Sequence, residues 1–146
     1  MAVRHEFERR CVCATLRKAT RSVTQFFDKT LRPCGLRATQ FHILAEIHGA
    51  GALTMTALTK TLVMDQTTLT RSLALLQRDG LVKFVPQTDA RVKSVELSKK
   101  GLKALQKAHP LWMAAQTKML STIGPAAWAA LSGELDRLAH APALEI

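Results

Sequence analysis

Residues 65–82 read DQTTLTRSLALLQRDGLV, and this stretch decides the fold. Asp65 has a side chain that helix N-caps prefer, and apolar residues follow it at steps of three and four. Gly80 and Leu81 supply the glycine and the apolar contact that commonly follow the end of a helix. The spacing therefore predicts a helix with one buried stripe, made of Leu69, Leu73 and Leu76.

A shorter helix is predicted just before this one. Thr54 or Thr56 can cap a helix that runs through Leu62. Only Val63 and Met64 then separate it from the next N-cap, so the turn between the helices is tight. Two helices joined by so short a turn form a helix-turn-helix arrangement.

The first turns of the longer helix carry an unusual polar face. Threonine is an indifferent helix former, and a face that only meets water more often carries Glu, Lys or Ala. Hydroxyl, amide and guanidinium groups reach phosphates and base edges in a DNA major groove. We therefore interpret this face as a DNA contact, with a merely solvated polar face as the alternative; its residues are Gln66, Thr67, Thr68, Thr70 and Arg71.

A β-hairpin is predicted after Gly80. Val82 and Phe84, and then Val95 and Leu97, alternate with polar residues around a turn near residues 87–90. A basic hairpin directly after a helix-turn-helix is a wing, whose arginine can enter a minor groove. The residues predicted to lie near its tip are Asp89, Arg91 and Lys93.

Helices are also predicted on both sides of this central part, so the expected fold class is mainly α. They cover about residues 6–31, 38–47, 98–120 and a last stretch from Pro125. The first has an apolar stripe of Val12, Leu16, Ala19, Val23 and Phe26. The sequence leaves open whether this stripe packs within the chain or against a second chain.

The charge balance favours a polyanionic partner. The 146 residues include 21 Lys and Arg but only 11 Asp and Glu, for a formal net charge of +10. Nucleic acid is the simplest such partner, and solubility alone is the alternative. Residues 51–97 have a net charge of only +2, so most of the positive charge lies on the flanking helices.

The sequence has neither a membrane-length apolar run nor the apolar core of a signal peptide, so we expect a cytosolic protein without membrane contact. Three cysteines in a reducing compartment make a structural disulfide framework improbable. There is also no glycine-rich phosphate loop, nucleophile elbow or paired carboxylate site. We therefore expect no enzyme and no cofactor.

The chain resembles the MarR family of bacterial transcription regulators. Three segments carry the resemblance: LRATQFHIL (36–44), DQTTLTRSLALLQRDGLV (65–82) and TDARVKSVELSKKG (88–101). The last has an Asp-x-Arg followed by a Val-x-Leu strand and a serine-capped helix, as in the family's wing. The resemblance implies a single domain over residues 1–146. It has a winged helix-turn-helix with a two-stranded β wing (about 36–97) and dimerisation helices (about 6–35 and 98–146).

The same resemblance implies a function. Members of this family form homodimers that bind a near-palindromic operator and usually repress a promoter. They release DNA when a small, often aromatic or phenolic, acid binds between the dimer helices and the DNA-binding part. By position, Arg91 would enter the minor groove and Asp89 would brace it or Arg71. An architectural DNA-binding protein without operator specificity is a weaker alternative, because indifferent binding needs only Lys and Arg.

Four residues are candidates for an effector pocket: Phe27, Phe41, His42 and Trp112. The same residues are equally suited to a hydrophobic core. His42 and Glu46 are one helical turn apart, so metal sensing is a further but weaker alternative. We expect no metal site.

Cys11, Cys13 and Cys34 are redox candidates. If Cys11 and Cys13 both lie on a helix, their side chains diverge by about 200° and cannot form a disulfide. Half-buried cysteines often act as small hydrophobic residues. Alternatively, Cys13 aligns with the reactive cysteine of the family's hydroperoxide-sensing branch, which becomes a sulfenate and then a disulfide. That branch hydrogen-bonds its cysteine with tyrosines, and this chain has none.

Overall fold

The computed structural model describes residues 11–86 and 93–141. Residues near the helix ends mark where most of the helices begin or stop. Asp65 and Ser98 cap the helices predicted to follow them, and Pro125 is the first residue of the last helix. Gly35 takes a left-handed conformation at the end of the short 3-10 helix that follows the first helix. In chain order the elements are α2 (Val12–Leu31), the 3-10 helix η1 (Arg32–Cys34), α3 (Ala38–Ala50), β1 (Leu53–Thr54), α4 (Met55–Leu62), α5 (Gln66–Arg78), β2 (Val82–Pro86), β3 (Lys93–Leu97), α6 (Lys99–Ile123) and α7 (Pro125–Ala139).

The helix-turn-helix is confirmed as α4 and α5. The Thr54 hydroxyl accepts a hydrogen bond from the Ala57 amide at 3.2 Å, so Thr54 is the cap of α4. Val63 ends α4 in a left-handed conformation, with a φ of 50°. This reversal allows α5 to begin only a few residues after α4 ends.

The strands form one antiparallel sheet in the order β1-β3-β2. The predicted hairpin is confirmed, with Phe84 opposite Val95, and Pro86 lies on the edge strand, where no inner ladder partner is needed. The third strand, β1, was not predicted. It has only two residues and pairs Leu53 with Val95, which is distant along the chain, so no local pattern announces it.

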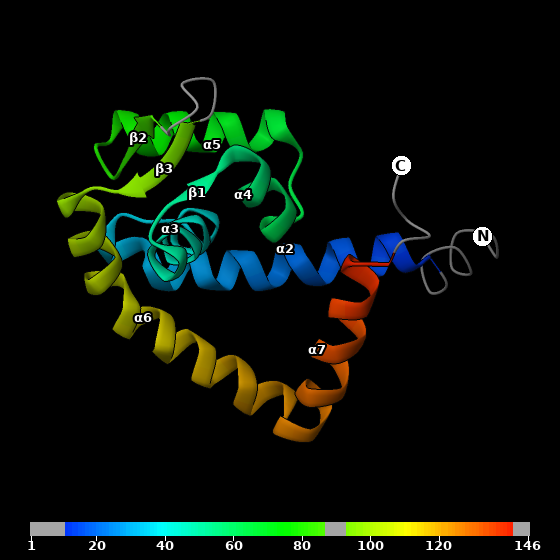
Figure 1. Ribbon diagram of the computed structural model, residues 1–146. Coiled ribbons are helices and arrows are strands. Elements are labelled where there is room, and N and C mark those ends of the chain that lie inside the picture. Colours follow the sequence, from blue (N-terminus) through cyan, green and yellow to red (C-terminus); the bar gives the residue numbers. More distant parts are fainter. Residues whose placement is uncertain (1–10, 87–92, 142–146) are drawn as a thin grey trace, which may run out of the picture.

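The core surrounds α3, which lies between α2 and the helix-turn-helix (Figure 1). A fully buried leucine contributes about 2 kcal/mol relative to an exposed one, so this cluster supplies the main apolar stabilisation. It draws on α2, α3, α4, α5, α6, β2 and β3. The largest fully buried side chains are Leu31, Ile43, Leu44, Ile47, Leu58, Leu69, Leu73, Leu76 and Val95.

The end of α5 is attached to the start of α6 by a compact junction. The Ser98 hydroxyl donates to the Gly80 carbonyl at 2.6 Å, and the Ser98 amide donates to the Leu81 carbonyl at 3.0 Å. Lys100 Nζ donates to the Asp79 carbonyl at 2.7 Å. A Cβ atom at Gly101 would lie 1.9 Å from the Leu81 carbonyl oxygen, so only glycine fits there. We call these contacts the α5–α6 junction.

Candidate nucleic-acid interface and adjoining cavity

The polar face predicted on α5 is exposed and occupies the start of that helix. Four of its residues line a surface hollow of about 390 Å³: Gln66, Thr67, Thr70 and Arg71. The buried leucines of α5 lie on its other side, against the core. The buried leucines fix the helix to the core, and its hydroxyl, amide and guanidinium groups point outward. Recognition of a DNA groove requires such an arrangement.

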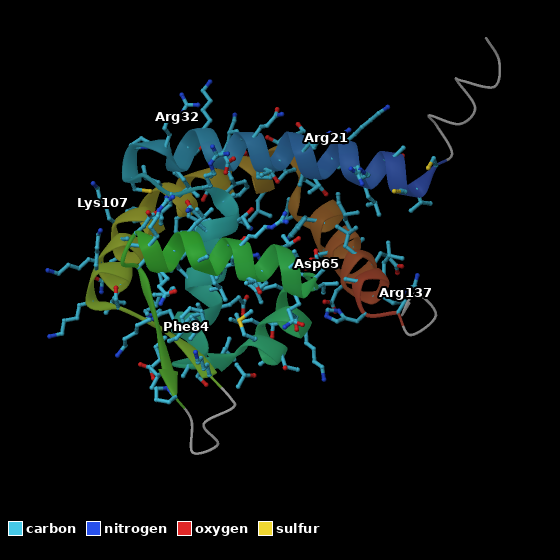
Figure 2. The ribbon with its side chains drawn as sticks, turned by 90° about the horizontal axis from the view of Figure 1, so that it is seen from above. Arg21, Arg32, Asp65, Phe84, Lys107 and Arg137 are labelled. Carbon is cyan, nitrogen blue, oxygen red and sulfur yellow. The ribbon has the colours of Figure 1, made fainter. Side chains whose placement is uncertain are left out.

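Thr68 differs from its neighbours, because its side chain is part of the helix cap. Its amide donates to Asp65 Oδ1 at 2.8 Å and its hydroxyl donates to Asp65 Oδ2 at 2.6 Å. These hydrogen bonds favour the carboxylate and hold the pKa of Asp65 below its ordinary value of 3.8. Asp65 lies at the start of α5 in the view from above (Figure 2).

The wing is described only at its base. Lys93 is exposed and opens β3 opposite Pro86, and Lys83 Nζ lies 3.2 Å from Glu96 Oε2 across the two strands. Asp89 and Arg91 lie outside the described residues. Their proposed minor-groove role therefore stays a prediction.

The four residues proposed for an effector pocket line one cavity of about 440 Å³. Phe27 comes from α2, Phe41 and His42 from α3, and Trp112 from α6. Phe41 and Trp112 stack with ring centroids 5.6 Å apart and an interplanar angle of 17°. Part of this aromatic set also belongs to the core, because Phe41 is buried and Trp112 packs against the core cluster.

The other three residues that line the cavity were not predicted to be part of it: Ala38, Ala45 and Glu46. Glu46 provides its carboxylate, and Glu46 Oε1 lies 3.3 Å from His42 Nε2. Ala38 and Ala45 leave room on the α3 side of the cavity. An alanine carries no chemical signal, and Glu46 stood out only as a metal candidate. Within residues 11–86 and 93–141, no three His, Cys, Asp or Glu side chains gather as metal ligands.

The structure agrees with the predicted half-burial of Cys11 and disagrees for Cys13. Helix α2 begins at Val12, so Cys11 is an extended N-cap whose Sγ accepts from the Ala14 amide at 3.4 Å. The argument from helical divergence therefore does not apply to this pair, although both thiols are free. Cys13 is exposed and not half-buried. Cys34 donates to the Leu31 carbonyl beyond the far end of α2, about 27 Å along the helix from Cys13, too far to form a disulfide within one chain.

Helices of the described part of the chain are all too short or too polar to cross a membrane.

Comparison with known proteins gives a consistent result. Residues 35–91 match the sequence model of the MarR family. The transcriptional regulator MosR of M. tuberculosis, in a crystal structure with DNA, is 41% identical, with a TM-score of 0.82 over 90% of this chain and 95% of that chain. No curated protein sequence matches.

Two more distant structures share the fold. A cysteine-to-serine mutant of E. coli MarR with operator DNA is 24% identical, with a TM-score of 0.81 over 90% of this chain and 96% of that one. BpsR of Bordetella bronchiseptica, whose DNA binding is regulated by 6-hydroxynicotinic acid, is 22% identical, with a TM-score of 0.81 over 90% and 95%. The family model, the 41% identity and the winged helix-turn-helix agree, and the chain belongs to the MarR family of DNA-binding transcription regulators.

Proposed function

We propose that this regulator is a homodimeric repressor of a near-palindromic operator, released when a small aromatic ligand enters the cavity between α2, α3 and α6. The exposed polar face at the start of α5 is the main support for the proposed DNA binding. Support comes from MosR, which is 41% identical and was crystallised with DNA. No feature of the described residues suggests catalysis, and the relatives are regulators.

Dimerisation is inferred from apolar side chains that the single chain leaves in water. Of the 20 residues of α2 only Leu31 is buried, and α7 has no buried residue. Val12, Val23, Leu131 and Leu138 are between 37% and 64% exposed. Covering these side chains with a second copy removes apolar surface from water, which is favourable.

Two-fold symmetry predicts the form of the operator. Two copies of α5 would enter major grooves about 34–36 Å apart, one turn of DNA, so the half-sites should be inverted repeats centred about 10 base pairs apart. The direct test is a footprint on the DNA upstream of the protein's own gene. Symmetric protection of two half-sites supports the proposal, and uniform protection without sequence preference contradicts it in favour of architectural binding.

The cavity lining suggests which ligands fit. Stacked Phe41 and Trp112 favour a planar ring. Among the described residues, the lining contains the Glu46 carboxylate and no lysine or arginine. An anionic ligand would be repelled by Glu46, whereas a phenolic hydroxyl or an ammonium group can donate to it. We therefore propose a neutral or cationic aromatic ligand, in contrast to the acids that the family resemblance implies.

Matched ligands test this. A phenol should release operator DNA, followed by fluorescence anisotropy, at a lower concentration than the benzoate with the same ring. In Glu46→Gln the difference between the effective concentrations of phenol and benzoate should shrink or reverse, because the substitution removes the carboxylate that repels benzoate. His48→Gln, an exposed residue of α3 outside the cavity lining, is the control. A benzoate that acts as well as the phenol on the unaltered protein contradicts the proposed ligand class.

Thiol-based sensing is a second candidate, favoured by the exposure of Cys13 at the start of α2. Cys11, two residues earlier in the chain, is the helix cap, so oxidation at either residue would alter the end of a proposed dimer helix. The test compares operator binding of the parent, Cys13→Ser and Cys11→Ser before and after mild hydroperoxide. If all three respond alike, neither cysteine is part of a switch.

A further inference from the structure

The first turns of α6 carry a one-sided basic surface. We call Lys99, Lys100, Lys103 and Lys107 the lysine face. At 100° per residue these four positions fall within an arc of about 100°, and all four side chains are exposed. The buried residues of the same turns lie on the other side of the helix: Gly101, Leu105 and Ala108.

Ordinary solvation does not account for this composition. The 25 residues of α6 include five lysines and no Asp or Glu, whereas solvated helix faces normally mix both signs and form i,i+4 pairs. Lys99 and Lys100 also occupy the first turn, where the helix dipole favours acids and disfavours cations. Within the described part of the chain, no carboxylate pairs with any of the four lysines, while Lys83 on the wing pairs with Glu96.

The α5–α6 junction attaches this face to the DNA-binding part. Lys100 Nζ donates to the Asp79 carbonyl, which directly follows α5, and Ser98 connects Gly80 and Leu81 to the start of α6. In the view from above, Lys107 projects from the edge of the molecule opposite Arg137 (Figure 2). The face therefore moves with α5 and lies at the end away from the proposed dimer helix α7.

We propose that the lysine face binds the phosphates of DNA that flanks each operator half-site. From Lys99 to Lys107 the helix rises about 12 Å, and one DNA strand carries a phosphate about every 3.4 Å of axis, so the face can meet about three phosphates. Such contacts add affinity and salt dependence without sequence preference. The proposal extends the DNA-binding function to a surface outside α5 and the wing.

The test compares two operator duplexes. One contains only the two half-sites, and the other extends them by about 10 base pairs on each side. Each neutralised phosphate adds about 0.9 to the slope of log affinity against log salt. Because the dimer has two such faces, we expect its slope on the long duplex to be steeper by about 5.

The variant Lys99→Gln/Lys103→Gln/Lys107→Gln should lose this difference while keeping its preference for operator over scrambled DNA. Lys100 is retained because it is part of the α5–α6 junction. For single changes, Lys107→Gln should reduce the difference and Lys118→Gln should not. Lys118 is an exposed lysine on the same side of α6, about 16 Å further along.

Equal slopes of the parent on both duplexes overturn the proposal. A triple variant that melts at the parent temperature but loses operator preference also overturns it, because the lysines would then belong to sequence recognition. Should the triple variant not fold, the Lys107→Gln and Lys118→Gln pair decides alone. A parent that binds operator and scrambled duplexes equally refutes the repressor proposal. A salt slope on the long scrambled duplex that the triple variant reduces would then still support the lysine face as a phosphate-binding surface.

Discussion

Thr68 is the residue at which the proposed DNA-binding face of α5 and the cap of that helix meet. Its position suggested a base or phosphate contact, but its hydroxyl already donates to Asp65. Arg71, one turn further, lies in the hollow with Gln66 and Thr70. Arg71 is therefore the better choice for testing sequence recognition, because its substitution leaves the cap intact.

Arg71→Ala should weaken operator binding by about 1–3 kcal/mol and relax the preference for operator over random DNA. The physical reason is the loss of a guanidinium that can reach base edges. Binding isotherms on both DNAs measure the effect. Arg78→Ala is the control, since Arg78 is on the same helix but its guanidinium lies 3.1 Å from Asp79. Equal losses on operator and random DNA would assign Arg71 to the backbone only.

Asp65 makes the start of α5 sensitive to acid. Its pKa is lowered in the folded chain by the Thr68 hydrogen bonds, so ionised Asp65 stabilises the fold above the ordinary value of 3.8, and this contribution is lost as the pH falls through the lower folded pKa. Asn can also cap a helix, but it has no charge. The parent should therefore melt above Asp65→Asn at neutral pH, and the gap should close below pH 3.8, measured by circular dichroism. A gap independent of pH would contradict this account.

At the scale of elements, the α5–α6 junction depends on one missing side chain. Gly101→Ala should cost about 1–3 kcal/mol of unfolding free energy, because its Cβ would overlap the Leu81 carbonyl and displace backbone. Urea unfolding measures this loss. Gly49→Ala in α3 is the matched control, since nothing lies within 4 Å of its added Cβ, and stability there should hold or rise. Equal behaviour of the two variants would show that the junction relaxes freely.

Elements were predictable from sequence where their signals are local. Ser98 and Pro125 mark helix starts within a turn of the residues they affect, and the stripe of α5 follows from the spacing of its leucines. Long-range contacts escaped prediction. Strand β1 pairs with β3, which is distant along the chain, and the start of α3 is capped by Asp28 Oδ1, which accepts from the Ala38 amide at 2.7 Å.

The lining of the candidate cavity was also predicted only in part. The aromatic residues and the histidine were predicted, because such side chains are recognisable as possible ligand contacts. The structure places them around one cavity: Phe27, Phe41, His42 and Trp112. Their role in binding stays a prediction. The contribution of Glu46 and of the small alanines depends on how α2, α3 and α6 pack together. That packing is a property of the tertiary structure and has no signal in any one segment.

At the scale of the whole molecule, the proposed dimer depends on α2 and α7. Leu131→Glu/Leu138→Glu should convert the dimer to a folded monomer at micromolar concentration, because charge is placed on side chains that are exposed in the single chain. Sedimentation velocity measures the mass, and circular dichroism checks the helix content. Leu75→Glu on α5 is the control, since Leu75 is 46% exposed but lies outside these helices. If the double variant stays dimeric, α7 is not the main interface.

Helix α6 runs without interruption from the α5–α6 junction to the wall of the aromatic cavity at Trp112. Thermodynamic reciprocity links the proposed DNA-binding surface and the proposed ligand cavity. A ligand that lowers operator affinity by a given factor must bind more weakly, by the same factor, to protein that is already on DNA. The pool of protein bound elsewhere on the chromosome would then set the ligand concentration at which the promoter responds, and the sensitivity of the switch would depend on how much DNA the cell contains.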